Sequence, residues 1–266
     1  MGAILQTTLL GIVQGVTEFL PISSSAHLAV IPWAFGMQEM TLAFDVALHF
    51  GTLLAIGVFF FKDWIELLKA GYGNLRGNKT KTGNMFWFLV AATIPGGIIG
   101  FILQHYFEDF FRTNFVLIGI ALIVVGIVMY LADKKAKSDI KFEDLTLKQT
   151  LIIGCSQALA FITGVSRSGA TITAGRMLGI DRESAAKFSF LLATPITLGA
   201  FLAHIPDIKA MGDELIPCII GIVVSFIVGL FVIKFLMQYL RKGSFKIFAI
   251  YRVIIGVAII GWFFIR

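Results

Sequence analysis

Six long apolar runs dominate this sequence. They lie at residues 42–61, 85–104, 114–132, 185–203, 215–239 and 247–265. A helix needs about 20 apolar residues to cross a hydrocarbon core of ~30 Å, and only helices and closed barrels satisfy their own backbone hydrogen bonds there. With 58% hydrophobic and 14% charged residues, the chain lacks the polar surface of a water-soluble domain. The sequence therefore predicts an all-α integral membrane protein with six full transmembrane helices.

Lysine and arginine residues cluster in three of the segments between these runs. The clusters are Lys62, Lys69, Arg76, Lys79 and Lys81; Lys134, Lys135, Lys137, Lys141 and Lys148; and Arg241, Lys242 and Lys246. The positive-inside rule places these segments in the cytoplasm, so the loops around Glu108–Asp109 and Asp207–Glu214 face outward. Because membrane orientation accounts for the net charge of +6, the basic residues predict no nucleic-acid partner.

Two further apolar regions are interrupted and do not fit as spans. Residues 3–36 are broken at Pro21–Ser25, and residues 149–180 are broken at Gly164–Ser168. Irregular backbone at membrane depth is tolerated only where protein or a water-filled cavity surrounds it. We therefore predict that each region forms a re-entrant hairpin, in which two short helices flank the break.

The two broken regions are copies of one element. A shift of 143 residues places Gly11 on Gly154, Gln14 on Gln157, Ser23 on Ser166 and Ser25 on Ser168. Repeat one then covers about residues 1–133 and repeat two about residues 144–266, each a hairpin followed by three spans. Because three is odd, we expect the second repeat to lie upside down in the membrane, an inverted-topology repeat. The first hairpin would enter from outside and the second from the cytoplasm.

Each break carries groups that suit an anion. Pro21 ends the first half-helix, and the serines at 23–25 can cap the next. In the second copy, Ser166 or Ser168 can serve as the cap. Helix N-termini present free N–H groups and partial positive charge, which favour a phosphate. Arg167 lies within the second break, and its guanidinium matches phosphate oxygens bidentately.

The first break is flanked by residues that could perform chemistry. Gln14 and Glu18 are four residues apart and share one helix face. A divalent cation between Glu18 and the phosphate would explain an acid in an anion site. His27 follows Ser24 by three residues, close enough to take a proton from a serine hydroxyl or from water. Ser24 or Ser25 could then be the nucleophile.

A few polar residues lie within the spans themselves. Asp45, His49 and Thr52 share one face of the first span. They either line the same cavity, or Asp45 and His49 pair with each other near the interface. Lys234 and Arg252 lie within two turns of cytoplasmic helix ends, and both are predicted to snorkel toward the headgroups.

Two motifs carry a family resemblance. "QGVTE" at 14–18 fits the (E/Q)xxxE motif, and "GVSRSGAT" at 164–171 fits the PGxSRSxxT motif, of bacterial undecaprenyl-diphosphate phosphatases, the bacitracin-resistance enzymes. The resemblance runs nearly the whole chain, including "FLPISSSAH" and the closing "IYR". It implies a bacterial plasma-membrane enzyme that hydrolyses the C55 isoprenoid diphosphate to the monophosphate, with Mg²⁺ or Ca²⁺, and so recycles the carrier lipid of cell-wall synthesis.

The resemblance also implies roles for individual residues. With the resemblance added to the residues, the predicted catalytic residues are Glu18, Ser24, His27 and Arg167, and the metal ligands are Gln14 and Glu18. The predicted phosphate-binding residues are Ser166, Ser168 and Thr171 of the second motif, together with Ser23 and Ser25 at the first helix start. Two positions depart from the family pattern. Gln14 is the weaker ligand option, which leaves more of the cation binding to Glu18. Thr163 stands where the motif has proline, so Gly164 alone must break that helix.

A phosphoryl-transfer mechanism follows from these assignments. Arg167, the helix N-termini and the cation would neutralise charge on the terminal phosphate, in a site that opens outward. Either Ser24 attacks with His27 as base, or His27 activates water. A lipid-phosphate flippase or anion transporter is the rival function, because inverted repeats around a midplane anion site also typify transporters. A homodimer is the working prediction for a bundle of this size.

Overall fold

The computed structural model describes residues 2–265, except for the side chains of residues 101, 103–105 and 107–109. The described chain is helical apart from short connections and one isolated β-bridge between Ile140 and Ile180. Six helices are long and apolar enough to cross a membrane, which confirms the predicted number. They are α3 (Leu42–Phe59), α5 (Lys81–Thr113), α6 (Phe115–Lys135), α9 (Arg182–Lys209), α10 (Leu215–Leu240) and α11 (Lys246–Ile265). This part of the fold class is therefore correct.

Four of the six helices begin at a side chain that caps their first turn. The caps are Thr41 for α3, Thr80 for α5, Asn114 for α6 and Asp181 for α9. Each side-chain oxygen accepts a hydrogen bond from the backbone N–H three residues on. The first N–H groups of a helix have no intrahelical acceptor, so these caps define where the helices start.

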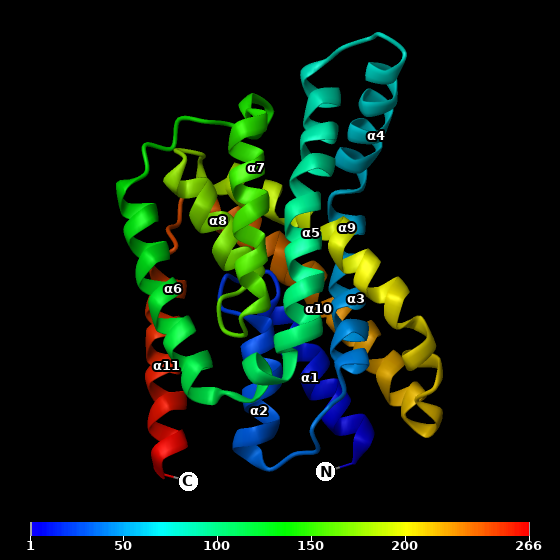
Figure 1. Cartoon of the computed structure of the whole chain (residues 1–266), viewed down its shortest axis with the longest axis vertical. Coiled ribbons are helices and arrows are strands. Elements are labelled where there is room, and N and C mark those ends of the chain that lie inside the picture. The colour runs from blue at the N-terminus through cyan, green and yellow to red at the C-terminus, as the bar shows by residue number, and fades with distance from the viewer. Residues whose placement is uncertain (1, 266) are drawn as a thin grey trace.

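Two segments predicted as loops are helical. The first basic segment contains helix α4 (Phe61–Leu75), which packs against α5 and projects beyond the bundle in Figure 1. Leu67 and Gly71 lie one turn apart and form its buried face, a short apolar stripe that the many charges obscured. Helix α5 continues to Thr113, through the predicted outer loop. The side chains of Glu108 and Asp109 in that loop lie outside the described residues.

The two interrupted regions form pairs of short helices at opposite ends of the bundle. The first pair is α1 (Ala3–Thr17) and α2 (Ser24–Phe35); the second is α7 (Leu147–Ser156), continued by the 3₁₀ turn η2 (Gln157–Phe161), and α8 (Arg167–Met177). In Figure 1, α1 and α2 occupy the lower half of the view and α7 and α8 the upper half. Two further 3₁₀ turns are η1 (Phe142–Asp144) and η3 (Gly212–Glu214).

Both breaks come earlier in the chain than predicted. The first turn covers residues 18–23 and does not extend to Ser25, and the second covers 162–166 and does not extend to Ser168. The reason is that a serine N-cap ends each turn, so the residues after it are already helical. The later serines therefore belong to the first turns of α2 and α8.

The irregular backbone of both turns is enclosed by protein. Phe19 in the first turn is fully buried, and its ring meets that of Phe190 in α9 edge-on, with 5.5 Å between centroids. Val165 in the second turn packs with Ala121 of α6 and Ala170 of α8. Such enclosure satisfies the condition for non-helical backbone at membrane depth.

Glycines let the two short-helix pairs approach the long helices closely. Gly11 in α1 faces α10, where an added Cβ would lie 2.8 Å from the Gly221 carbonyl oxygen. Gly154 in α7 faces α5, where an added Cβ would collide with the Ala92 carbonyl. The 143-residue shift places these two glycines on each other. In both copies, the glycine lets the first short helix pack closely on a long helix, α10 in one case and α5 in the other.

A buried ionic cluster anchors α8, and sequence analysis missed it. Asp133, near the end of α6, accepts a hydrogen bond of 2.8 Å from Arg176 of α8. The same oxygen accepts one of 2.8 Å from Arg182 of α9. Its second oxygen accepts from the backbone N–H of Phe245, at 3.2 Å. Arg176 is 1% exposed, so this carboxylate holds three elements together in the protein interior.

Candidate active site

The two breaks meet in the middle of the bundle. The Glu18 carboxylate, in the first turn, forms an ion pair with the Arg167 guanidinium, at the start of α8. Arg167 also donates a hydrogen bond of 2.5 Å to the hydroxyl of Thr197 in α9. The Ser168 hydroxyl donates to the Glu18 backbone carbonyl at 3.4 Å. Residues that are far apart in the sequence therefore form one polar centre.

Arg252 of α11 also joins the two turns. Its guanidinium donates to the backbone carbonyls of Pro21 at 3.1 Å and Gly164 at 2.7 Å, one in each break. Further bonds reach Leu122 at 3.2 Å and Val165 at 3.0 Å. Arg252 is 0% exposed, so the prediction that it snorkels is wrong. Broken helices leave carbonyls without intrahelical donors, and a guanidinium with five N–H groups supplies them. Snorkelling was predicted only from how near Arg252 lies to the end of its helix, which takes no account of buried carbonyl partners.

Lys234, the other residue predicted to snorkel, has an exposed side chain. An exposed position is compatible with a side chain that extends along the helix toward the headgroups.

The serine caps of α2 and α8 adopt the same unusual conformation. Ser23 has φ 74° and Ser166 has φ 73°, values that are uncommon for residues other than glycine. Each side chain accepts from a backbone N–H three residues on, at 3.4 Å for Ala26 and 3.1 Å for Gly169. Strained backbone of this kind persists where the surroundings hold it and is concentrated at functional sites.

A second serine lies two residues after each cap. The hydroxyls of Ser23 and Ser25 lie 3.3 Å apart, and those of Ser166 and Ser168 lie 3.1 Å apart. The two half-helix starts are thus chemically alike, as the repeat in the sequence indicates.

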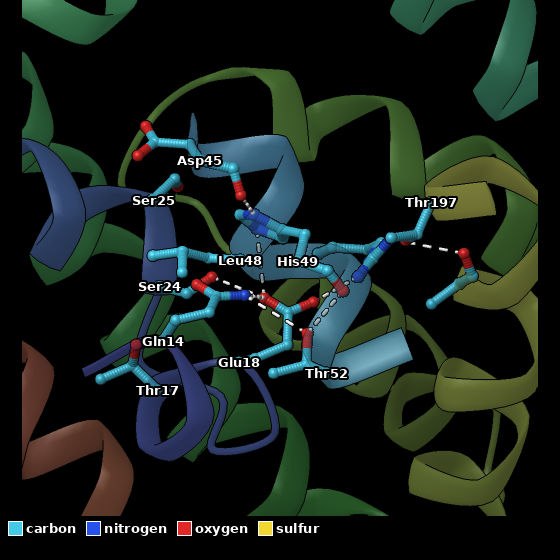
Figure 2. Close-up of polar contacts among 12 residues, drawn as sticks. Gln14, Thr17, Glu18, Ser24, Ser25, Asp45, Leu48, His49, Thr52 and Thr197 are labelled. Carbon is cyan, nitrogen blue, oxygen red and sulfur yellow. Dashed lines mark hydrogen bonds and ion pairs between the residues drawn. The ribbon is translucent and has the colours of Figure 1, made fainter. Parts of the chain in front are cut away.

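Glu18 is the centre of the polar contacts in Figure 2. Its Oε2 accepts hydrogen bonds from the Ser24 hydroxyl at 2.7 Å and from Gln14 Nε2 at 3.1 Å. His49 Nε2 lies 3.3 Å from the same oxygen. Gln14 Nε2 also lies 3.4 Å from the Thr52 hydroxyl, which ties α1 to α3. Three side chains therefore contact Oε2 of this carboxylate: Ser24, Gln14 and His49. The Ser24 hydroxyl is the nearest of them.

Asp45 and His49 both line the cavity at this centre, and their carboxylate and ring do not pair with each other. His49 Nδ1 bonds the Asp45 backbone carbonyl at 2.8 Å, whereas the Asp45 carboxylate pairs with Arg112 at 2.7 Å. Because the Asp45 carbonyl and the Glu18 carboxylate can only accept, His49 donates to both only when its ring carries both protons. Arg112 was not singled out from the sequence, although a basic residue at the outer end of a span is the signal for it.

A cavity of about 260 Å³ opens over these groups. Eight of the predicted site residues line it, and they come from both breaks and from α3. They are Glu18, Ser24, Ser25, Asp45, His49, Ser166, Arg167 and Ser168. Two basic residues, Arg112 and Arg167, lie on its wall, and each is paired with an acid of the same wall, Asp45 and Glu18. The starts of α2 and α8 beside them present backbone N–H groups, which suit an anionic ligand.

Four predicted site residues lie outside the cavity wall. Gln14 is fully buried behind Glu18, and Ser23 is the cap described above. Thr171 bonds the Ser189 hydroxyl at 2.7 Å, inside the protein. His27 is also buried, and its two ring nitrogens bond the Ser23 carbonyl and the Tyr251 hydroxyl, each at 2.7 Å. Neither partner of His27 is Ser24, so its predicted role as a base stays a prediction.

Oxygen atoms at this centre fit a hard divalent cation in part. Among the described side chains, no cluster of three or more His, Cys, Asp or Glu residues could hold a metal ion. Gln14 Oε1, however, is buried without a hydrogen-bond partner, while Nε2 is the end of the amide that contacts the Glu18 carboxylate. One carboxylate and one amide oxygen suit Mg²⁺, which takes its other ligands from water and phosphate.

The fold and the site define a multi-pass α-helical membrane protein with a buried polar centre between two broken helices. Residues 7–258 match the family model described as "Bacitracin resistance protein BacA". The chain belongs to this family, as the two motifs predicted.

Curated relatives match over almost their whole length. The undecaprenyl-diphosphatase of Pelotomaculum thermopropionicum is 50% identical over 257 residues, which cover 97% of this chain and 96% of that protein. The undecaprenyl-diphosphatase of Caldicellulosiruptor bescii is 44% identical over 262 residues, 98% of each. That of Moorella thermoacetica is 43% identical over 263 residues, 99% of each.

Proposed function

We propose that this protein is an undecaprenyl-diphosphatase, which hydrolyses undecaprenyl diphosphate to undecaprenyl phosphate and inorganic phosphate. Full-length relatives at 43–50% identity carry that name. The structural observation that carries the proposal is the contact of the Ser24 hydroxyl with Glu18, opposite Arg167 and within an anion-compatible cavity. A candidate nucleophile, Ser24, therefore lies beside a proton acceptor, Glu18, and a guanidinium group, that of Arg167.

Ser24 is the proposed nucleophile, and Glu18 its proton acceptor. The Ser24 oxygen attacks the terminal phosphorus while its proton passes to Glu18 Oε2, 2.7 Å away. The bond from phosphorus to the bridging oxygen breaks, which releases undecaprenyl phosphate, and water then cleaves the phosphoserine. In the competing route, Glu18 takes the proton from a water that attacks directly. Both routes need the same carboxylate, so they share the dependence on Glu18.

Arg167 and the two helix starts stabilise the transferred group. The first turns of α2 and α8 offer backbone N–H groups, and Arg167 offers paired N–H donors to the phosphate oxygens. Charge that develops on those oxygens is neutralised by groups already in position, which costs no reorganisation during the reaction. Ser25, Ser166 and Ser168 line the cavity beside these donors and are proposed to bind the phosphate.

A divalent cation, Mg²⁺ or Ca²⁺, is proposed as the cofactor, with Glu18 and Gln14 as its protein ligands. When bound, it would supply further neutralisation of phosphate charge. The unpartnered Gln14 Oε1 supports this assignment, and binding would require the amide to turn so that Oε1 replaces Nε2 beside Glu18. Phosphate release measured after chelator treatment, with and without added Mg²⁺, tests it.

The chain is proposed to contain two re-entrant hairpins in an inverted repeat of about residues 1–133 and 144–266. In support, the hairpin helix α1 packs on α10 of the other half, and α7 packs on α5 of the first half. The helix pairs α3 with α9 and α6 with α11, which correspond in the two halves, also pack together. These contacts are related by exchange of the two halves, which supports the proposed two-fold relation.

The cavity is proposed to open to the periplasmic side. The positive-inside orientation supports this, because it places the α1–α2 pair at the outer face. A Leu42→Cys variant in a background with Cys155 and Cys218 replaced by serine tests it, since Leu42 lines the cavity. We expect a membrane-impermeant maleimide to label intact cells at this position. Labelling only after permeabilisation would reverse the orientation.

A homodimer also remains a proposal. Cross-linking in native membranes and the mass of the detergent-solubilised protein test it.

Phosphate release from undecaprenyl diphosphate in proteoliposomes tests the function directly. We expect release by the wild type and loss of more than about 100-fold in Glu18→Gln and Ser24→Ala, since removing one transition-state group costs this much in other enzymes. Lys234→Ala, an exposed position away from the cavity, is the matched control. Absence of release by folded wild type that binds the lipid would replace the enzyme by the flippase or transporter.

A further inference from the structure

The Gln157 side chain is buried in the cavity wall without a hydrogen-bond partner. It is 1% exposed, and neither its Nε2 nor its Oε1 bonds any described residue. It lines the same cavity as Glu18, Ser24 and Arg167. A buried amide with both ends unpaired is unfavourable in protein and more so at membrane depth. Such a group is expected to gain its partner from a ligand of the cavity.

The space for this amide comes from a glycine in α5. An added Cβ at Gly96 would lie 2.5 Å from Gln157 Nε2 and 3.1 Å from its Cγ. The amide therefore packs directly against the backbone of α5, just after Pro95. At the neighbouring Gly97 an added Cβ would meet nothing within 4 Å. A methyl group added at Gly96 would therefore displace the Gln157 amide, whereas one added at Gly97 would contact nothing.

Comparison of the two halves shows what the Gln157 amide lacks. Gln14 occupies the same position in the first half, and its Nε2 donates to Glu18, four residues later. The residue four after Gln157 is Phe161, whose side chain has no acceptor. The second half of the cavity instead contributes Arg167 and the start of α8. The Nε2 donor of Gln157 therefore has no partner in the described part of the protein and is available to an acceptor on the ligand. It lies near Arg167 and the start of α8, which attract anions.

We propose that Gln157 is a substrate-binding residue whose Nε2 donates a hydrogen bond to a non-bridging phosphate oxygen of the diphosphate. This inference rests on the proposed function, because it takes the same ligand in the same cavity. An amide has a donating and an accepting end, and unprotonated phosphate oxygens only accept, so Nε2 is the end that must donate. In this structure Nε2 lies against Gly96 of α5, so we infer that the amide turns about its terminal bond when the diphosphate binds. Gln157 and Arg167 then bind the phosphate from one half, opposite Ser24.

Four variants test this assignment with two readouts. The first readout is the Kd of a polyprenyl diphosphonate in which methylene replaces the bridging oxygen, which measures binding without hydrolysis. The second is kcat and KM for undecaprenyl diphosphate. Gln157→Leu removes the donor at similar volume, Gln157→Glu replaces it with an acceptor, and Gly96→Ala displaces it. Gly97→Ala is the matched control, with the same gain in helix propensity.

We expect Gln157→Leu to raise Kd and KM about 10-fold, the loss of one hydrogen bond to a charged group, and Gln157→Glu to raise them further. Gly96→Ala should raise Kd as well, and Gly97→Ala should leave it unchanged. An unchanged Kd in both Gln157→Leu and Gly96→Ala would overturn the inference, even if the wild type hydrolyses the lipid. Conversely, wild type that binds the analogue without hydrolysing the substrate, with weaker binding in Gln157→Leu, would overturn the phosphatase and retain the binding site.

Discussion

Glu18 and Arg167, which are 149 residues apart in the sequence, form an ion pair that joins the two helix breaks. One is the acid of the first motif and the other is the arginine of the second. Their contact brings the two half-helix starts to one cavity. The pair also means that neither charge is left alone in the protein interior, where an isolated charge would be costly.

The Arg167 fork, and not only its charge, should matter for activity. Arg167 contacts both Glu18 and Thr197 through a rigid planar fork of donors, whereas the ammonium of lysine presents its donors from a single atom. We expect Arg167→Lys to lower kcat/KM at least about 10-fold and Arg167→Ala about 100-fold or more. Steady-state phosphate release measures both, with thermal stability as the folding control. Full activity of Arg167→Lys would show that a point charge is sufficient.

Loss of Arg252 should destabilise the fold more than it alters substrate affinity. Its guanidinium satisfies carbonyls in both breaks, and truncation would leave them buried and unpaired at a cost of about 1–3 kcal/mol each. We expect Arg252→Met to lower the Tm of the detergent-solubilised protein by several degrees or to prevent folding. Arg252→Lys should recover part of the loss.

Lys234→Met is the control for that experiment, because it removes a cation from an exposed position in α10. A Tm for Arg252→Met equal to that of Lys234→Met would contradict the bridging role.

The positive φ of Ser166 leads to an ordered series of variants. Ser166→Ala removes the cap and keeps the strained φ of 73°, whereas Ser166→Gly removes the cap and relieves the strain. We therefore expect Ser166→Gly to be more stable than Ser166→Ala by roughly 1 kcal/mol. Thermal unfolding in matched detergent gives the order, and the reverse order would show that φ carries no strain here.

His27 should influence activity through position rather than as the base. Its two ring nitrogens hold the Ser23 carbonyl and Tyr251, and Ser24 instead contacts Glu18. We expect His27→Ala to lower kcat but to leave the acidic limb of the pH–rate profile at the same pH. Tyr251→Phe should have the same kind of effect, at about 10-fold or less, because it removes one neutral hydrogen bond.

If His27 were the base, the acidic limb would disappear in His27→Ala, and Tyr251→Phe would shift its pH. The profile therefore separates the two roles, which the rate alone cannot do.

Much of this architecture was predictable because hydrophobicity and helix interruption are local properties. Runs of apolar residues indicated six spans, since each helix satisfies its own backbone bonds in lipid. Pro21, Gly164 and the adjacent serines indicated two breaks, and the shift of 143 residues related them. The cavity-lining serines and Arg167 followed from the affinity of helix starts for anions.

Partners of individual side chains depended on the tertiary structure. Arg252 was predicted to reach the headgroups, yet it bonds carbonyls of Pro21 and Gly164, which lie 231 and 88 residues away along the chain. In the same way, His27 bonds Tyr251 rather than Ser24, and the Asp45 carboxylate pairs with Arg112 rather than with His49. Sequence alone determined the six apolar spans and that two further regions are broken, with the breaks placed to within a few residues. Only the packing of the two halves decided which donor meets which acceptor, because those contacts join residues that no local pattern relates.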